Sequence, residues 1–144
     1  MAMLRALFPQ AIFMPKQKAI HVLVKIRSKT LNSEFLALID SGATENFISP
    51  KVVEYFSIPT QELPNPKTIH SIDGTKNSIR KVTHRALLKI CHQNQSDTHP
   101  FFVIDLGEDP ILLGMPFLAT YNPIINWIKG KFQGTITAST DDVH

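Results

Sequence analysis

The chain has 144 residues, of which 43% are apolar, and its formal net charge is +3 at pH 7. This length is typical of one domain, and the apolar fraction is sufficient for a hydrophobic core. The basic residues are scattered and do not gather with aromatic residues, so we expect no nucleic-acid partner. No apolar run approaches the ~20 residues of a membrane-spanning helix, so we expect no membrane partner. The single cysteine, Cys91, cannot form an internal disulfide, which favours a reducing compartment such as the cytoplasm.

The first predicted elements lead into a short polar segment. Residues 1–17 are interpreted as an N-terminal extension, or as what remains where the segment was cut from a longer chain. Residues 18–27 show the two-residue apolar period of a β-strand. Residues 35–39, FLALI, form a continuous apolar run, which predicts a strand buried on both faces.

The buried strand is followed directly by Asp40, Ser41, Gly42, Ala43 and Thr44. A carboxylate at the end of a buried strand is costly to ionise and requires a functional explanation. Gly42 permits a tight turn and the close approach of another backbone, and the hydroxyl groups of Ser41 and Thr44 flank that turn. An acid held by a rigid strand among hydrogen-bonding groups is typical of an acid/base catalyst.

The later elements are predicted to be short. A helix is expected at residues 50–56, because Ser49 is a favourable N-cap and Pro50 suits the first helical position. The other predictions are a strand at 46–48, a proline-rich connection at 61–66, a hairpin at 68–79, a strand at 79–90, a polar loop at 92–99, strands at 100–104 and 111–114, a helix at 115–120, a final hairpin of 124–128 with 131–137, and a disordered tail.

Many short strands with only two short helices predict an all-β protein that forms a small closed β-barrel with one or two short helices. Closure removes the sheet edges that would otherwise invite aggregation. Cys91, His92 and His99 match no common zinc spacing, so no metal site is expected. Trp127 and the phenylalanines at 101, 102, 117 and 132 are predicted as core residues.

The residues around Asp40 resemble the active-site motif of the retropepsins, the aspartic proteases of retroviruses and LTR retrotransposons. The family pattern, two apolar residues followed by Asp-Thr/Ser-Gly-Ala-Thr/Ser, is matched at residues 38–44. A second family motif, in which aliphatic residues followed by Gly pack beside the active-site loop, is matched by Ile111, Leu112, Leu113 and Gly114.

The resemblance extends to the gypsy-type retrotransposon proteases. Residues 46–49, 115–118 and 122–127 are similar to motifs of that group, with Phe117 and Asn126 as departures from its usual residues. The resemblance therefore implies a barrel of the retropepsin (acid protease) type at residues 18–137, between the extension at 1–17 and the tail at 138–144.

Hydrolysis of a peptide bond needs a base that activates water and an acid that protonates the carbonyl oxygen. Two adjacent carboxylates that share one proton supply both functions. The chain offers one suitable aspartate, so a catalytic interpretation requires a second copy with both Asp40 side chains on a two-fold axis. The resemblance implies the same homodimer, since retropepsins are homodimers.

The resemblance also implies individual roles. Asp40, Ser41 and Gly42 would form the catalytic motif, in which Ser41 locks the two loops across the dimer axis. The hairpin at Asp73-Gly74, a strong two-residue turn signal, resembles the flap that closes over a bound peptide. The expected substrate-binding residues are Ala43, Thr44, Ile72, Asp73, Gly74 and Thr75.

We therefore expect a homodimeric aspartic endopeptidase that processes a retrotransposon Gag-Pol polyprotein at extended, largely apolar segments. It would act in the cytoplasm or in virus-like particles, and no metal or organic cofactor is implied. One alternative is a non-catalytic retropepsin-like module that binds peptides or dimerises. Another is a structural β-barrel without a site, for which both motifs are coincidental.

Overall fold

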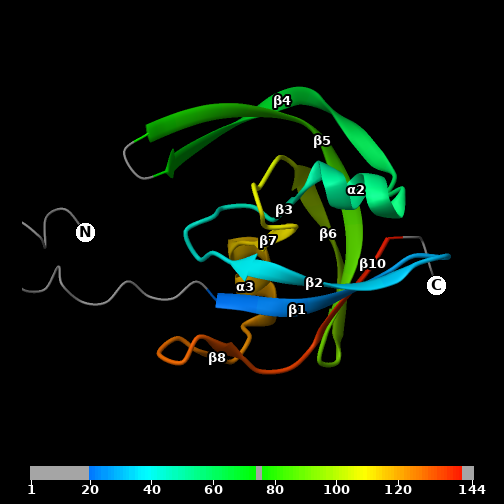
Figure 1. Cartoon of the computed structure of the whole chain (residues 1–144), viewed down its shortest axis with the longest axis vertical. Helices are drawn as coiled ribbons and strands as arrows, with labels where there is room; N and C mark the ends of the chain where they lie inside the picture. Colours follow the sequence, from blue (N-terminus) through cyan, green and yellow to red (C-terminus); the bar gives the residue numbers. More distant parts are fainter. Residues whose placement is uncertain (1–19, 74–75, 141–144) are drawn as a thin grey trace, which may run out of the picture.

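The computed structural model describes residues 20–73 and 76–140, with backbone alone at residues 71–73 and 76–78. The predicted extension at 1–17 and the end of the predicted tail lie outside the described residues. The elements, labelled in Figure 1, are β1 (Ile20–Arg27), β2 (Asn32–Ile39), β3 (Phe47–Ile48), α2 (Pro50–Phe56), β4 (Thr60–Asp73), β5 (Lys76–His92), β6 (Gln95–Val103), β7 (Ile111–Leu113), α3 (Met115–Tyr121), β8 (Ile125–Asn126), β9 (Lys131–Phe132) and β10 (Ile136–Ser139).

Seven of the described strands close into a mixed barrel, in the order β10, β1, β2, β7, β3, β6 and β5. The ring closes because β10 pairs in parallel with β1 and antiparallel with β5. β4 pairs with β5 outside the ring, and β8 pairs with β9 in a small separate sheet. The prediction of a small closed β-barrel with two short helices is confirmed.

The interior of the barrel is filled by alternate side chains of the strands. In β1, Ile20, Val22, Val24 and Ile26 are all buried, while the residues between them are exposed. This is the two-residue period that predicted the strand. Phe117 of α3 packs into the same core.

Both helices are confirmed, and local signals explain where they begin and end. The Ser49 hydroxyl accepts a hydrogen bond from the Lys51 N–H at 3.2 Å, and Ser57 takes a left-handed conformation (φ +52°) after α2. α3 includes Tyr121, one residue more than predicted, and Asn122 follows it in a left-handed conformation (φ +42°).

The interpretation of β2 as a strand buried on both faces is wrong. Ala37 and Ile39 are buried, but Leu36 is 56% exposed. Leu36 lies opposite Leu23 of β1, which is 48% exposed, so both leucines are on the outer face of the barrel. An apolar run does not say which of its faces another element covers, because that depends on distant parts of the chain.

Two segments that were predicted as connections lie in strands. The proline-rich residues 61–66 belong to β4, where the pairing with β5 shifts register between Glu62 and Lys67. Most of the predicted polar loop at 92–99 is a tight hairpin, since β5 ends at His92 and β6 begins at Gln95. Both predictions were wrong because they took polar residues as a sign of a connection. These strands have exposed faces on which polar residues are stable.

The end of the chain also differs from the prediction. The final hairpin consists only of β8 and β9, and residues 136–139 form the separate strand β10 inside the barrel wall. β10 carries Ala138 into the segment predicted to be a disordered tail, and the Thr140 N–H donates to the Arg27 carbonyl at 2.9 Å. Trp127 is 41% exposed, so its assignment to the core is wrong.

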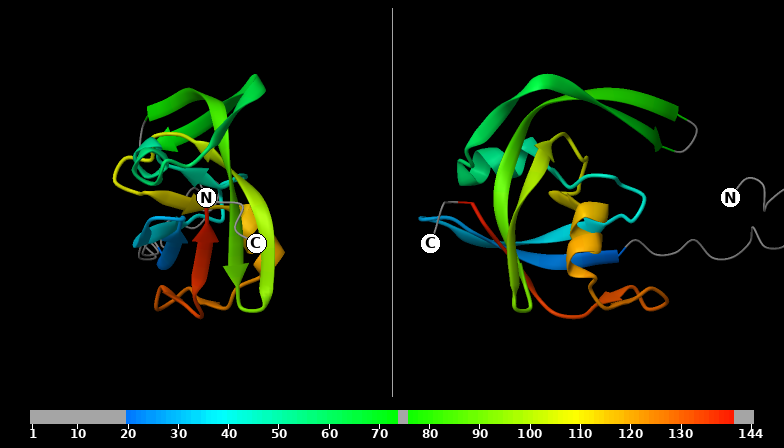
Figure 2. Two further views of the ribbon diagram at one scale, coloured as in Figure 1. Left: turned by 90° about the vertical axis from the view of Figure 1, so that its right-hand side faces the viewer. Right: turned by 180° about the vertical axis from the view of Figure 1, so that it is seen from behind.

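The paired parts of β4 and β5, residues 60–73 and 76–86, are called the arms below. They arch over one side of the barrel, and their free ends lie on the same side of the molecule as the segment after β2 (Figures 1 and 2). A second apolar cluster lies between the arms and the barrel and contains Phe47, Val82, Phe102 and Ile104. The arms are thus attached to the barrel by a small core of their own.

Candidate active site

The segment after β2, residues 40–46, is called the Asp40 loop below, and backbone contacts hold Asp40 in place. The Asp40 N–H donates to the Leu113 carbonyl of β7 at 3.0 Å. The Asp40 carboxylate accepts the Gly42 N–H at 2.9 Å, and the Asp40 carbonyl accepts the Ala43 N–H at 3.1 Å. These contacts fold the loop into a tight turn and fix the carboxylate at the end of a barrel strand.

The second sequence motif lies beside this loop, as predicted. β7 runs parallel to β2, with Leu113 opposite Ile39, and Gly114 follows directly. A Cβ placed on Gly114 would lie 2.3 Å from the Glu45 carbonyl oxygen and 2.8 Å from that of Ala43. No side chain fits at those distances from backbone atoms, so the Asp40 loop requires glycine at this position.

Asn46 is a structural residue whose role the sequence did not reveal. Its side chain is 1% exposed, and its Oδ1 accepts the Gly114 N–H at 2.8 Å. The Met115 N–H donates to the Ala43 carbonyl at 2.9 Å, so the loop and the start of α3 are linked twice. The available signal was the position of Asn46 in a motif shared with retrotransposon proteases, which did not indicate this contact.

The Asp40 carboxylate faces a cleft of about 570 Å³ between the Asp40 loop and the arms. Among the described residues that line this cleft, Asp40 is the only acidic one. The lining residues are Asp40, Gly42, Ala43 and Thr44 from the loop, Phe47, Ile104, Leu106 and Leu112 from the barrel, and Lys67, Thr68, Ile69, His70 and Arg80 from the arms.

The cleft brings together only part of the predicted set. Ser41 is exposed and is not part of the lining, and Ile111 and Leu113 are buried in the core behind it. The backbones of Ile72 and Asp73 lie in β4, which places them in the arms. The predicted flap residues Gly74 and Thr75 lie outside the described residues.

The basic side chains of the cleft were not predicted. Lys67, His70 and Arg80 lie far apart from Asp40 in the sequence and reach the cleft only because β4 and β5 arch over the loop. The Lys67 ammonium contacts the Glu45 carboxylate of the Asp40 loop at 2.5 Å. This contact links the two sides of the cleft.

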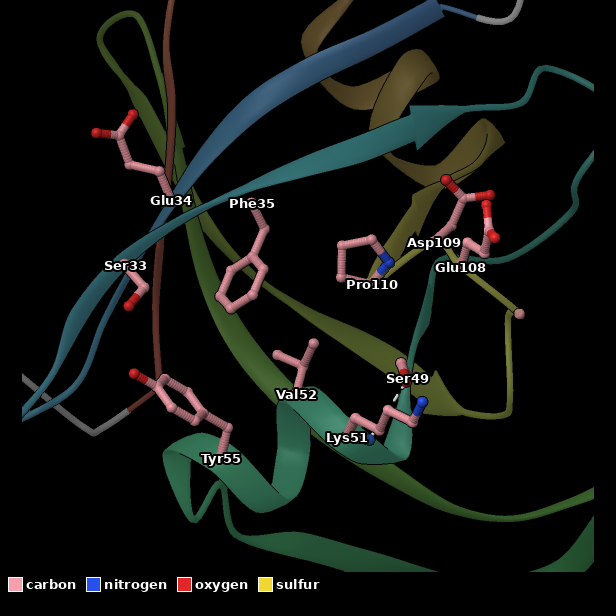
Figure 3. Close-up of a pocket in the computed structure, with 11 residues that line it drawn as sticks. Ser33, Glu34, Phe35, Ser49, Lys51, Val52, Tyr55, Glu108, Asp109 and Pro110 are labelled. Atoms are coloured by element: carbon pink, nitrogen blue, oxygen red, sulfur yellow. Dashed lines mark hydrogen bonds between the residues drawn. The ribbon is translucent and has the colours of Figure 1, made fainter.

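A larger hollow, of about 720 Å³, lies elsewhere, between α2, β2 and the segment before β7 (Figure 3). Its floor is apolar, formed by Phe35, Val52, Tyr55 and Pro110, and Glu108 and Asp109 lie at one end. It contains neither Asp40 nor any residue of the Asp40 loop. We therefore place the candidate active site in the smaller cleft, where a fixed carboxylate is present.

Among the described residues, the ionisable groups whose pKa is shifted lie away from the cleft, between β6 and α3. Burial lowers the pKa of His99, and the nearby Asp97 opposes that effect. Burial, together with Asp97, raises the pKa of Tyr121. The His99 Nε2 lies 2.9 Å from the Tyr121 hydroxyl, which donates to the Ile90 carbonyl at 3.2 Å. This arrangement stabilises the packing of α3 on the barrel.

Comparison with known proteins identifies the family. A protein-family model described as the PEG10/RTL1 protease domain matches residues 36–141, which include the Asp40 loop and the whole lining of the cleft. The chain belongs to this protease domain family. The resemblance to retropepsins is therefore confirmed at the level of a retropepsin-like domain of retrotransposon origin.

A viral protein is also similar. The chain is 27% identical to a polyprotein (CP) of Cassava vein mosaic virus over 113 residues, which are 74% of this chain and 8% of the viral protein. The chain thus spans a small part of that relative's length. In residues 20–73 and 76–140, no helix is long and apolar enough to span a membrane, and no group of three or more His, Cys, Asp or Glu side chains could hold a metal ion.

Proposed function

We propose that this chain is one half of an aspartic endopeptidase. The observation that carries the proposal is the Asp40 carboxylate, fixed by the Gly42 N–H at 2.9 Å and facing a cleft large enough for an extended peptide. The membership of the protease domain family supports the same activity.

In the proposed mechanism, two Asp40 carboxylates from two copies of the chain hold a water molecule between them. The pair shares one proton, because the charge of the first carboxylate opposes ionisation of the second. The charged member takes a proton from the water as it attacks the peptide carbonyl, and the protonated member donates to the carbonyl oxygen. Ser41 would stabilise the approach of the two loops.

The need for a second copy follows from the single carboxylate in the described cleft. Exposed apolar surface on the same edge of the barrel supports this arrangement. Ile128, in the turn between β8 and β9, is 98% exposed. A Cβ on Gly130 of that turn would lie 4.0 Å from Ile20, which pairs with Ile39 next to Asp40. The turn that carries Ile128 therefore lies near the start of β1, at the edge of the barrel where Asp40 follows β2, and we expect a partner bound at that edge to lie close to this turn.

The proposed substrate is a polyprotein of a gypsy-type LTR retrotransposon, bound as an extended strand between the Asp40 loop and the arms. The similarity to a viral polyprotein supports this origin. Cleavage would take place in the cytoplasm or in virus-like particles.

The test is a peptide-cleavage assay at about pH 5, with and without pepstatin, on the parent, Asp40→Asn and Glu34→Gln. Asn is isosteric with Asp but cannot act as a base, so cleavage should fall by about three orders of magnitude or more. Glu34→Gln makes the same change on an exposed residue of β2, the strand that precedes Asp40, and should cleave like the parent. A folded parent that does not cleave, or cleavage that survives Asp40→Asn, would refute the proposal in favour of a non-catalytic module or a contaminating protease.

A further inference from the structure

Two cationic residues of the arms lie on the side that faces the cleft. Lys67 pairs with Val82, and Ile69 pairs with Arg80. Val82 is fully buried beneath the arms, and successive side chains of a strand alternate between its faces. Arg80 is therefore on the cleft side of β5, whereas Lys81 is on the outer side.

These two cations differ in how their charge is compensated. The Lys67 ammonium contacts the Glu45 carboxylate and lies 5.0 Å from the centre of the Phe102 ring. The Arg80 guanidinium donates from Nη1 to the Asp105 carbonyl at 2.6 Å, which is a neutral acceptor. Among the described side chains, no carboxylate forms an ion pair with Arg80. Arg80 is held in position while its charge stays available.

The remaining guanidinium N–H groups suit a planar carboxylate. A guanidinium has five N–H donors in a fixed fork that matches a carboxylate with two parallel hydrogen bonds. The described lining around Arg80 is apolar at Ile69, Ile104 and Leu106, and its only acidic residue is Asp40. Arg80 is exposed, so a bound apolar peptide would displace water from its guanidinium without supplying an acceptor, whereas a peptide with an acidic side chain would supply one.

We propose that Arg80 is a specificity-determining residue that binds an aspartate or glutamate side chain of the substrate peptide. This inference rests on the proposed function and narrows its substrate class from apolar segments to apolar segments that carry an acidic residue. In a two-fold dimer the cleft contains two copies of Arg80, one on each side of the scissile bond. Acidic residues on both sides of that bond would then strengthen binding of the substrate.

The experiment measures peptide binding separately from cleavage. The probe is a capped, fluorescently labelled peptide of about ten residues, rich in Leu, Val and Gln, in which Glu replaces one residue at a time. Its dissociation constant is measured with Asp40→Asn, which cannot cleave it. We expect Glu to tighten binding about three- to tenfold at one position on each side of the centre, and less at high salt.

Variants of the arms identify the residue responsible. In the Asp40→Asn background, Arg80→Gln should abolish the preference for Glu over Gln. Arg80→Lys should retain part of it, because the charge stays but the planar fork is lost. Lys81→Gln removes the same charge from the next residue of the strand, on its outer side, and should leave the preference unchanged.

The outcomes separate this inference from the proposed function. A Glu preference that survives Arg80→Gln, or a scan in which Glu never tightens binding, would overturn the Arg80 subsite. A preference for Glu on one side of the peptide only would overturn the inference that both copies of Arg80 bind the substrate. A parent that binds acidic peptides through Arg80 but cleaves none of them would refute the protease function and leave the subsite in place.

Discussion

The two sides of the cleft are held in different ways. The Asp40 loop is bound to the barrel by backbone hydrogen bonds and by the buried Asn46 side chain, which accepts the Gly114 N–H. The arms above it meet the barrel through a small apolar cluster and through two polar contacts, the part-buried pair of Lys67 with Glu45 and the exposed hydrogen bond of Arg80 to the Asp105 carbonyl.

This difference suits the proposed aspartic endopeptidase. A catalytic carboxylate must keep its geometry within a fraction of an ångström, which requires neighbours held in place by packing and hydrogen bonds. The side that admits a peptide must open, and segments with few buried contacts open at the lowest free energy. We therefore expect changes in the loop to affect folding and chemistry, and changes in the arms to affect local opening and substrate choice.

The largest effect on stability is expected for Gly114→Ala. Its Cβ would meet two backbone oxygens of the Asp40 loop, at 2.3 and 2.8 Å, so the loop or α3 must move. The free energy of unfolding should fall by about 1–3 kcal/mol, measured by urea denaturation.

A second change shows whether the backbone contacts are responsible. Ala43→Gly, added to Gly114→Ala, removes a Cβ at 3.1 Å but leaves both oxygens in place. Stability should therefore not recover. Recovered stability in the double variant, or an unchanged stability of Gly114→Ala alone, would show that close backbone contacts with Gly114 do not hold the Asp40 loop in place.

The association of two copies should depend on pH through the Asp40 loop. Two facing carboxylates repel when both are charged, so the dimer would bind one proton that the separated chains do not, and association should be tighter near pH 5 than near pH 8. Asp40→Asn has no charge at this position and should associate more tightly than the parent at about pH 8, with a weaker pH dependence. Sedimentation of both proteins measures this. A parent dimer that tightens as the pH rises would mean that the two Asp40 side chains do not face each other.

Lys67→Met tests the other side of the cleft. The substitution removes the contact with Glu45 but keeps an unbranched apolar side chain. Because Lys67 is partly exposed, the global free energy of unfolding should change by less than about 1 kcal/mol. Amide exchange in β4 should speed up, while amides of β2 stay as in the parent. Equal acceleration in both strands would contradict the difference between the two sides.

The smallest pH-dependent effect is expected outside both sides of the cleft, at His99→Gln. Burial lowers the pKa of His99, so the unfolded chain binds this proton more readily than the folded chain does. The stability due to neutral His99 is complete above the unfolded value of about 6.5 and is lost as the pH falls through the lower folded value. The variant should therefore lose less stability than the parent as the pH falls from about 7 to about 5. Peptide cleavage should be unchanged, which provides the baseline for the other variants.

Local signals predicted the parts of the site that are close in sequence. The turn at residues 40–44 and both helices were identified from neighbouring residues, because a cap, a proline and a glycine act within one turn of chain. The contact of Gly114 with the Asp40 loop spans a long stretch of sequence and was predicted only through the resemblance of two motifs. The pairing partner of β10 had no local signal, so that segment was assigned to a hairpin and a tail.

The sequence by itself determined the turn at residues 40–44, the helices and the closed β class, because these depend on short-range chemistry and on the overall pattern of apolar residues. Only the tertiary structure decided that Leu36 is exposed, that Asn46 supports Gly114, and that Arg80 faces the same cleft as Asp40. The physical reason is that burial and charge pairing depend on which strands become neighbours. In this barrel many of those neighbours are far apart along the chain.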